Sequence, residues 1–296
     1  MIACSACRRL MLSACRRPGH AMIGAMETAA SSETGYADRP EDENIPLHDD
    51  GCGGIAVVID YQNMHLCGWD SYAQEDAWKY ERMLDPVELA LTIAGKEGKP
   101  LKALVVCRGL PDKDRKAYWY DIEQHRVWKA KADDLGIPSK FIIRKMRKCD
   151  DGAADGSDRI EEKGIDIACA LEFIDLAYHG GFDDVVLCSH DTDFIPALEK
   201  AVAYGAAVSQ AYWKGGECKE FYPLHLNPAY GCQHTVQLTE DDYRRCLDRH
   251  SWSHALDAAP KHVRDGISTI RTDPVRVMMA SRIAGSGVRA EAEDVQ

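Results

Sequence analysis

Residues Val57–Asn63 read Val-Val-Ile-Asp-Tyr-Gln-Asn, and residues Val185–Phe194 read Val-Val-Leu-Cys-Ser-His-Asp-Thr-Asp-Phe. Each stretch is a short apolar run, rich in β-branched residues, that ends in carboxylates. Such runs are typical of strands that are buried on both faces of a parallel sheet. In open α/β sheets, ligands bind beyond the carboxyl ends of the strands. Carboxylates at two such ends therefore indicate a site for a hard cation.

The composition is that of a globular protein in a reducing compartment. The chain has 296 residues, of which 45% are hydrophobic and 28% are charged. No apolar run reaches the roughly 20 residues that a membrane-spanning helix needs, so we expect no membrane partner. The formal charge of -12 argues against bulk electrostatic coating of nucleic acid, but it is compatible with a local basic strip. The twelve cysteines are scattered, which favours buried thiols and a cytoplasmic protein over a disulfide framework.

Strand-like and helix-like segments alternate along the chain. Strands are predicted over residues 55–60, 101–107, 140–145, 184–189 and 207–213, with an edge strand over 236–238. Helices are predicted over residues 112–135, 165–177, 194–204 and 240–250, and a further helix begins at Pro86 with Asp85 as its N-cap. The segment after the first strand, residues 61–72, is interpreted as a loop. This alternation predicts an α/β fold with three layers (α/β/α) around a central, mainly parallel sheet of the Rossmann-like kind.

The organisation predicted from these patterns has three parts. Residues 1–53 are interpreted as a disordered leader, because residues 22–53 are rich in Ser, Gly, Ala and acidic side chains and lack periodicity. Residues 54–250 form the predicted folded domain. Residues 251–296 show no clear pattern and are interpreted as a largely flexible extension.

Four carboxylates are candidates for the cation site: Asp60, Asp166, Asp191 and Asp193. Each also has a local interpretation, because Asp60 can begin an Asx-turn, Asp166 suits a first helical turn, and Asp193 can cap a helix. Taken together, the four carboxylates favour a cation site over these local interpretations. Carboxylates gathered in a small volume repel one another unless a cation neutralises them. Mg²⁺ or Mn²⁺ takes oxygen ligands, keeps waters and bridges to phosphate. We therefore predict metal-assisted hydrolysis of a phosphate ester at these residues.

Three further polar residues support this site. Asn63 lies one turn beyond Asp60 and adds a neutral oxygen and an amide donor. Ser189 can hold a carboxylate or a water, and His190 is a candidate for assisting proton transfer.

At these residues the chain resembles a NYN domain of the LabA-like branch of the PIN-like nuclease superfamily. The matching segments are residues 58–63, 163–168 and 189–196, and they occur in the family's order. The resemblance implies a PIN-like fold, a divalent metal on Asp60, Asp166, Asp191 and Asp193, and endonucleolytic hydrolysis of RNA. The chain departs from the family at His190, where many relatives have glycine.

A basic strip is predicted to hold single-stranded or structured RNA. Arg144, Lys145, Arg147 and Lys148 follow the third predicted strand, and Arg108 follows the second. Both groups are expected at the same edge of the sheet as the acids, where they would contact phosphates. A homo-oligomer is left open by the sequence.

Other classes of function remain as alternatives. A catalytically inactive RNA- or protein-binding regulatory module of the LabA type would keep the same fold. A phosphomonoesterase of the haloacid-dehalogenase type is disfavoured. Its first strand ends in Asp-x-Asp, whereas this chain reads Asp60-Tyr61-Gln62, with Gln62 in place of the second Asp. A dinucleotide-binding site is also disfavoured, because Gly51, Gly53 and Gly54 precede the first strand instead of following it.

Overall fold

A computed structural model describes residues 53–72, 83–149, 159–161, 164–215, 221–230, 234–250 and 253–265, together with Leu47 and Gly51. Most of the predicted leader and all residues after 265 lie outside these ranges. None of the helices within the described ranges has both the length and the apolar content that a bilayer crossing requires.

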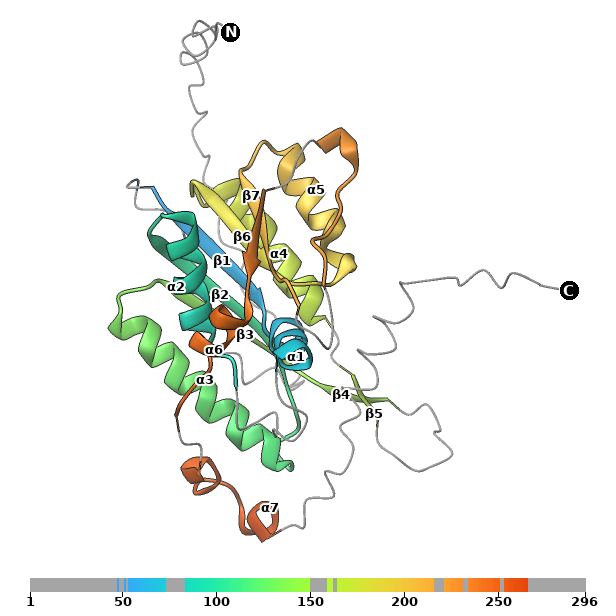
Figure 1. The fold of residues 1–296 in the computed structure, drawn as a ribbon. Coiled ribbons are helices and arrows are strands. Elements are labelled where there is room, and N and C mark those ends of the chain that lie inside the picture. Colours follow the sequence, from blue (N-terminus) through green and yellow to red (C-terminus); the bar gives the residue numbers. More distant parts are fainter. Residues whose placement is uncertain are drawn as a thin grey trace, which may run out of the picture. The chain divides into compact units, whose positions relative to one another are not determined.

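The centre of the fold is a six-stranded sheet in the order β3-β2-β1-β6-β7-β8, and all its neighbours pair in parallel (Figure 1). The strands are β1 (Ile55–Asp60), β2 (Leu101–Leu110), β3 (Ser139–Lys145), β6 (Asp184–Cys188), β7 (Val208–Trp213) and β8 (His234–Leu238). Two short strands, β4 (Arg147–Cys149) and β5 (Arg159–Glu161), pair antiparallel outside this sheet. The predicted parallel sheet, with its late edge strand, is confirmed.

Helices cover both faces of the sheet, as the three-layer prediction requires (Figure 1). One face carries α1 (Tyr61–Tyr72), α2 (Pro86–Glu97), α3 (Lys116–Asp134) and α6 (Glu240–Arg245), and the other carries α4 (Ile165–His179) and α5 (Ile195–Ala203). The remaining short helices are η3 (Thr192–Phe194), η4 (Pro228–Tyr230), η5 (Ser253–Leu256) and α7 (Lys261–Asp265).

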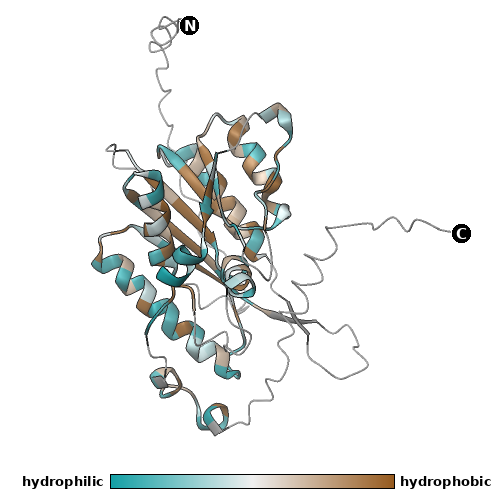
Figure 2. Cartoon of the chain, viewed as in Figure 1, coloured by the Kyte–Doolittle hydropathy of each residue, from teal (hydrophilic) through white to brown (hydrophobic). Residues whose placement is uncertain are grey.

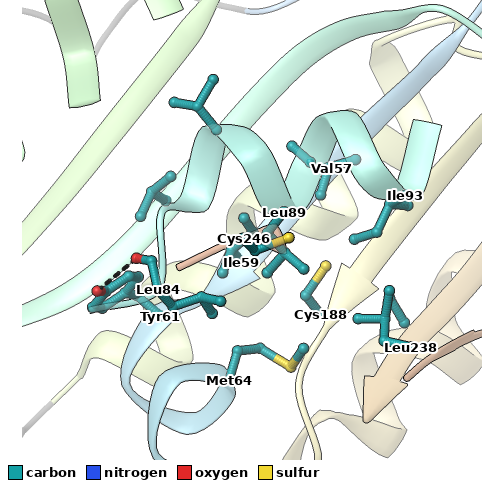
Figure 3. Packing of buried hydrophobic residues seen from close by; sticks show 14 of the residues in the cluster. Val57, Ile59, Tyr61, Met64, Leu84, Leu89, Ile93, Cys188, Leu238 and Cys246 are labelled. Atoms are coloured by element: carbon teal, nitrogen blue, oxygen red, sulfur yellow. Dashed lines mark hydrogen bonds between the residues drawn. The ribbon is translucent and has the colours of Figure 1, made fainter. Parts of the chain in front are cut away.

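Alternation along the strands divides the core into two clusters. In β1, Val57 and Ile59 pack under α1, α2 and α3, while Ala56 and Val58 pack under α4 and α5. Figure 2 shows the apolar strands between helices with polar outer faces, and Figure 3 shows the first cluster closely packed around Ile59 and Met64. Burial on both faces explains why these strands are continuous apolar runs and not alternating ones.

The chain changes direction in the sheet at β1. From β1 it adds β2 and β3 on one side, and it then returns to add β6, β7 and β8 on the other. The carboxyl ends of β1 and β6 therefore flank the topological switch point, where ligands of doubly wound sheets bind.

The start of α2 matches its prediction. Asp85 is the N-cap, and its Oδ1 accepts hydrogen bonds from the backbone N–H groups of Val87 at 2.8 Å and Glu88 at 3.2 Å. Pro86 occupies the first helical position, and Gly98 ends the helix with φ = 63°.

The prediction of a loop after β1 is wrong, because Tyr61–Tyr72 forms α1. Its buried residues include Tyr61, Met64 and Gly68, which recur at helical spacing and face the core. Gly68 permits a close approach, since a Cβ there would lie 2.9 Å from the Tyr243 ring and 3.1 Å from that of Trp213. The aromatic, Gly and Ser content of the segment concealed a helix whose packing depends on distant residues.

The second correction concerns Arg108, which was predicted to contact RNA phosphates. Strand β2 continues to Leu110, so Arg108 lies within the strand, and alternation turns its side chain toward α3. Arg108 is only 2% exposed, its Nη2 lies 2.8 Å from Asp121 Oδ1, and its guanidinium covers the rings of Tyr61 and Trp128 at 4.8 and 5.4 Å. Arg108 therefore forms a buried ion pair with Asp121 beneath α3, and its side chain does not reach the surface.

The short helices that follow α6 pack onto the domain. Ala255, Ala259 and Val263 are buried, and His254 Nε2 lies 3.3 Å from Glu123 Oε1 of α3. The predicted domain boundary at residue 250 remains a prediction.

Arg108→Met is expected to lower the free energy of unfolding by about 3–5 kcal/mol, because it removes the cation from a buried carboxylate. The double variant Arg108→Met/Asp121→Leu should recover most of this loss, since apolar residues can replace a buried ion pair. Urea unfolding followed by circular dichroism measures both. Equal losses for the single and the double variant would contradict the assigned pairing.

Candidate active site

A serine hydroxyl joins the two strand ends at the switch point. Asp60 is the last residue of β1 and is 5% exposed, and Ser189 follows β6 and is fully buried. Ser189 Oγ donates to Asp60 Oδ2 at 3.0 Å and accepts the backbone N–H of Asp191 at 3.1 Å. One hydroxyl thus fixes the Asp60 carboxylate and the loop that carries Asp191.

Asp191 organises the segment that follows. Its Oδ1 accepts the backbone N–H of Asp193 at 3.0 Å and caps η3, so the capping carboxylate is Asp191 and not Asp193. The Asp193 residue is exposed and lies in η3, two positions further from the buried strand end. Both acids lie on the loop beyond the carboxyl end of β6.

Asp166 lies in the first turn of α4, after Gly164 with φ = 80°. One turn later, Cys169 is buried in the same cluster as Cys107, which is the register partner of Asp60 in β2. Helix α4 runs antiparallel to the strands, because it connects the carboxyl edge of the sheet to the start of β6. Its first turn, with Asp166, therefore lies at the same edge of the sheet as Asp60.

Two of the predicted supporting residues, Asn63 and His190, are hydrogen-bonded to each other. Asn63 Oδ1 accepts the backbone N–H of His190 at 2.8 Å, which ties α1 to the loop after β6. His190 Nε2 accepts the backbone N–H of Trp213 at 3.2 Å, and its ring lies 4.4 Å from that of Phe221. A ring nitrogen that accepts a hydrogen bond carries no proton in that contact, so Nε2 serves here as an acceptor. The geometry assigns both residues to holding the loop.

Sequence reasoning missed Gln210, a fully buried residue of β7. Its Nε2 donates to the Ser189 carbonyl at 2.8 Å, and its Oε1 accepts the backbone N–H of Leu224 at 2.7 Å. Gln210 therefore fixes the backbone that carries the Ser189 hydroxyl. A glutamine inside a predicted buried strand was the available signal, because buried polar side chains are nearly always hydrogen-bonded.

The thiols near the acids are held in the neutral form. A hydrogen bond with Cys107, together with burial and the charge of Asp60, raises the pKa of the Cys169 thiol well above its ordinary value. Burial, and then the charge of Asp60, also raises the pKa of Cys188. Neutral buried thiols are poor nucleophiles and poor metal ligands, so neither Cys169 nor Cys188 is a candidate for these roles.

The carboxylates at this edge supply the oxygen ligands that a divalent cation such as Mg²⁺ takes. Within the described parts of the chain, no three His, Cys, Asp or Glu side chains come together in a group that could hold a metal ion. Two of the predicted acids are linked through one residue, since Ser189 Oγ donates to the Asp60 carboxylate and accepts the backbone N–H of Asp191. Mg²⁺ is commonly held by one or two carboxylates, with waters and substrate phosphate as its other ligands, so this pair fits that cation.

The basic strip begins at the end of β3. Arg144 is half-buried and Lys145 is exposed, while Arg147 and Lys148 belong to β4, where only the backbone is described. The register pairs Asp60 with Cys107 and Cys107 with Ile142. Arg144 and Lys145 therefore lie two strands, or about 10 Å, to the side of Asp60 and some 7–10 Å further along the strand direction.

Gln210→Met is expected to lower the free energy of unfolding by about 2–4 kcal/mol, because it leaves a buried carbonyl and a buried N–H without their partner. Gln237→Met in the neighbouring strand is the matched control, since Gln237 is exposed and its Oε1 accepts a 3.2 Å hydrogen bond from Tyr212 Oη; a change below about 1.5 kcal/mol is expected there. Urea unfolding of the three proteins measures the difference. Equal stabilities of the two variants would contradict the role given to Gln210.

The fold and these contacts define a doubly wound α/β protein with an acidic centre at its switch point. A family model described as NYN domain matches residues 54–219, which is more than half of the chain. The chain therefore belongs to the NYN domain family, a family of PIN-like nucleases. Neither the curated proteins nor the solved structures include a match to it.

Proposed function

We propose that this protein is a metal-dependent endoribonuclease that hydrolyses RNA phosphodiester bonds. The observation that carries the proposal is the Ser189 hydroxyl, which links Asp60 and the Asp191 loop at the switch point of a nuclease-family sheet. The position is where doubly wound sheets bind ligands, and the side chains are those that hard cations select.

In this proposal Asp60 and Asp191 would hold Mg²⁺ or Mn²⁺, and Asp166 and Asp193 would add negative charge at the same edge of the sheet. The cation, when bound, polarises a phosphoryl oxygen and lowers the pKa of a bound water. Ser189 orients the Asp60 carboxylate through its 3.0 Å hydrogen bond. These hydrogen bonds fix the strand ends relative to each other, which favours catalysis by preorganised groups.

The proposed RNA contacts follow from the strip at the end of β3. Arg144, Lys145, Arg147 and Lys148 would bind phosphates of a single-stranded or structured RNA that reaches the acidic centre. Arg108 is removed from this set by its burial against Asp121. A few basic side chains beside an acidic centre are consistent with the overall charge of -12, since phosphate contact needs only a few such side chains.

We also propose a cytoplasmic location. Five cysteines whose side chains the structure describes are free and buried: Cys67, Cys107, Cys169, Cys188 and Cys246. Burial raises the pKa of Cys246 to about 12, which keeps this thiol protonated and unreactive. Free thiols packed as small apolar side chains suit a reducing compartment.

Asp60→Asn and Asp191→Asn are each expected to lower the rate of RNA cleavage at least about 100-fold, because each removes a carboxylate from the proposed cation site. The substitutions keep the side-chain shape and an oxygen that can accept the Ser189 or Asp193 hydrogen bond. The assay uses purified protein, a mixed RNA pool and a matching single-stranded DNA, with Mg²⁺, Mn²⁺ or EDTA.

Asp241→Asn, an exposed acid on α6, is the matched control and should cleave at the wild-type rate. Wild-type activity in both site variants would contradict the site assignment. Binding of RNA without any metal-dependent product, by a folded wild-type protein, would instead support the regulatory module.

Replacing both Arg144 and Lys145 with Ala is expected to weaken RNA binding. It should also reduce the slope of the logarithm of the binding constant against the logarithm of the salt concentration. The slope should fall by about 0.7 for each lost phosphate contact. Fluorescence anisotropy in an Asp191→Asn background measures binding without cleavage, and Lys261→Ala on α7 is the control. An unchanged slope would show that the strip does not contact phosphates.

A further inference from the structure

Two neighbouring aromatic residues lie in the first turn of α3. Tyr118 and Trp119 are both half-buried, and their ring centroids lie 5.3 Å apart at an interplanar angle of 79°. Trp119 Nε1 donates to the carbonyl of Lys113 at 3.0 Å, which holds the indole against the loop between β2 and α3. In an edge-to-face pair, one ring contributes only its edge, so its flat faces are not used by the pair.

The first turn of α3 lies beyond the carboxyl ends of the strands. Further along the same helix, the Trp128 ring lies 5.1 Å from that of Tyr61, the residue that follows Asp60. Trp119 is nine residues before Trp128, which places it about 14 Å further out along the helix axis. The helix runs antiparallel to the strands, since it connects the end of β2 to the start of β3. The aromatic pair therefore lies at the same edge of the sheet as the candidate active site (Figure 1).

A lysine of β3 lies on the same face of the sheet as this pair. The Phe141 ring of β3 packs against that of His125 in α3, with centroids 4.9 Å apart. Lys145 follows Phe141 by four residues, so alternation directs it to the α3 side, about 13 Å nearer the carboxyl edge. Tyr118 precedes His125 by seven residues, which is about 10 Å in the same direction. The exposed Lys145 and the aromatic pair are therefore nearly level with each other.

The cations beside the pair come from two elements. Lys116 is the first residue of α3, and Lys145 ends β3. The loop before α3 carries the exposed Lys113, but it also holds Asp112 and Asp114, which offset its positive charge. Lysines beside aromatic rings are the composition of single-stranded nucleic-acid sites, where cations contact the backbone and rings stack on bases.

We propose that Tyr118 and Trp119 form a stacking site for unpaired bases of RNA, with Lys145 on a neighbouring phosphate. The inference rests on the proposed ribonuclease function and names its substrate class, which is RNA that is single-stranded at this site. A base inside a duplex is stacked and paired, so its flat face does not reach a protein ring. The bound strand extends from the aromatic pair across the ends of β2 and β1 to Asp60.

The test compares a labelled single-stranded RNA of mixed sequence with an oligonucleotide of the same length whose central nucleotides are abasic. Fluorescence anisotropy of the full-length Asp191→Asn protein in EDTA measures binding without cleavage. We expect the loss of the bases to weaken binding by this parent protein about 5- to 100-fold. Tyr118→Ala/Trp119→Ala should bind the intact RNA with a similar loss, and it should bind the two probes nearly equally. If the double variant weakens both probes alike, or neither, the stacking site is overturned.

Three further variants separate stacking from folding. Trp119→Phe keeps an aromatic face and loses the N–H that bonds to Lys113, so it should bind the intact RNA nearly as well as the parent. Tyr118→Leu/Trp119→Leu keeps apolar bulk without rings, and it should lose the discrimination between the probes even if the alanine variant does not fold. Tyr178→Ala is the control, because Tyr178 is 59% exposed near the end of α4, at the opposite edge of the sheet, and should bind both probes like the parent.

A blunt-ended RNA duplex of the same sequence tests the substrate class. The parent should bind the duplex more weakly than the single strand at equal salt, and loss of both rings should leave duplex binding unchanged. Duplex binding that is as strong and as dependent on the rings would overturn the inference. The binding assays need no turnover, so stacking can be confirmed in a protein that never cleaves. Metal-dependent cleavage by a protein whose binding ignores the rings would overturn stacking and leave the ribonuclease proposal intact.

Discussion

The candidate site depends on one hydroxyl. Ser189 lies between the carboxyl ends of two neighbouring parallel strands, donates to Asp60 and accepts from the backbone of Asp191. Without this contact, the carboxylate that ends β1 and the loop that follows β6 would be positioned independently. Gln210 extends the arrangement into the next strand by holding the Ser189 carbonyl, and Asn63 extends it into α1 through His190. Three strands and one helix thus share one set of hydrogen bonds.

The sheet topology explains why this contact forms at a functional edge. The chain winds outward from β1 in both directions, so the ends of β1 and β6 have helices on opposite faces. The alternation that buries Ala56 and Val58 toward α4 also directs Asp60 to that side, where Cys169 and the first turn of α4 lie. Fold and site therefore arise from the same two-residue period of β1.

Local patterns were sufficient for the existence of the six strands of the main sheet and for the polar ends of β1 and β6. The bounds of β1 and the cap at Asp85 agree with prediction, because β-branched runs and N-caps are determined by neighbouring residues. Helix α1 and the true end of β2 were not predictable in this way, because they depend on packing against Tyr243, Trp213 and Asp121. The error over Arg108 followed directly from ending β2 three residues early. Gln210 was missed because its partners are distant in sequence.

The most direct test of the account is a crystal structure of the full chain with Mn²⁺, with the cation located by its anomalous scattering. The account predicts an anomalous peak within bonding distance of the Asp60 and Asp191 carboxylates, with Ser189 still hydrogen-bonded to Asp60. A peak elsewhere on the chain, or none at these carboxylates under conditions that saturate binding, would contradict it.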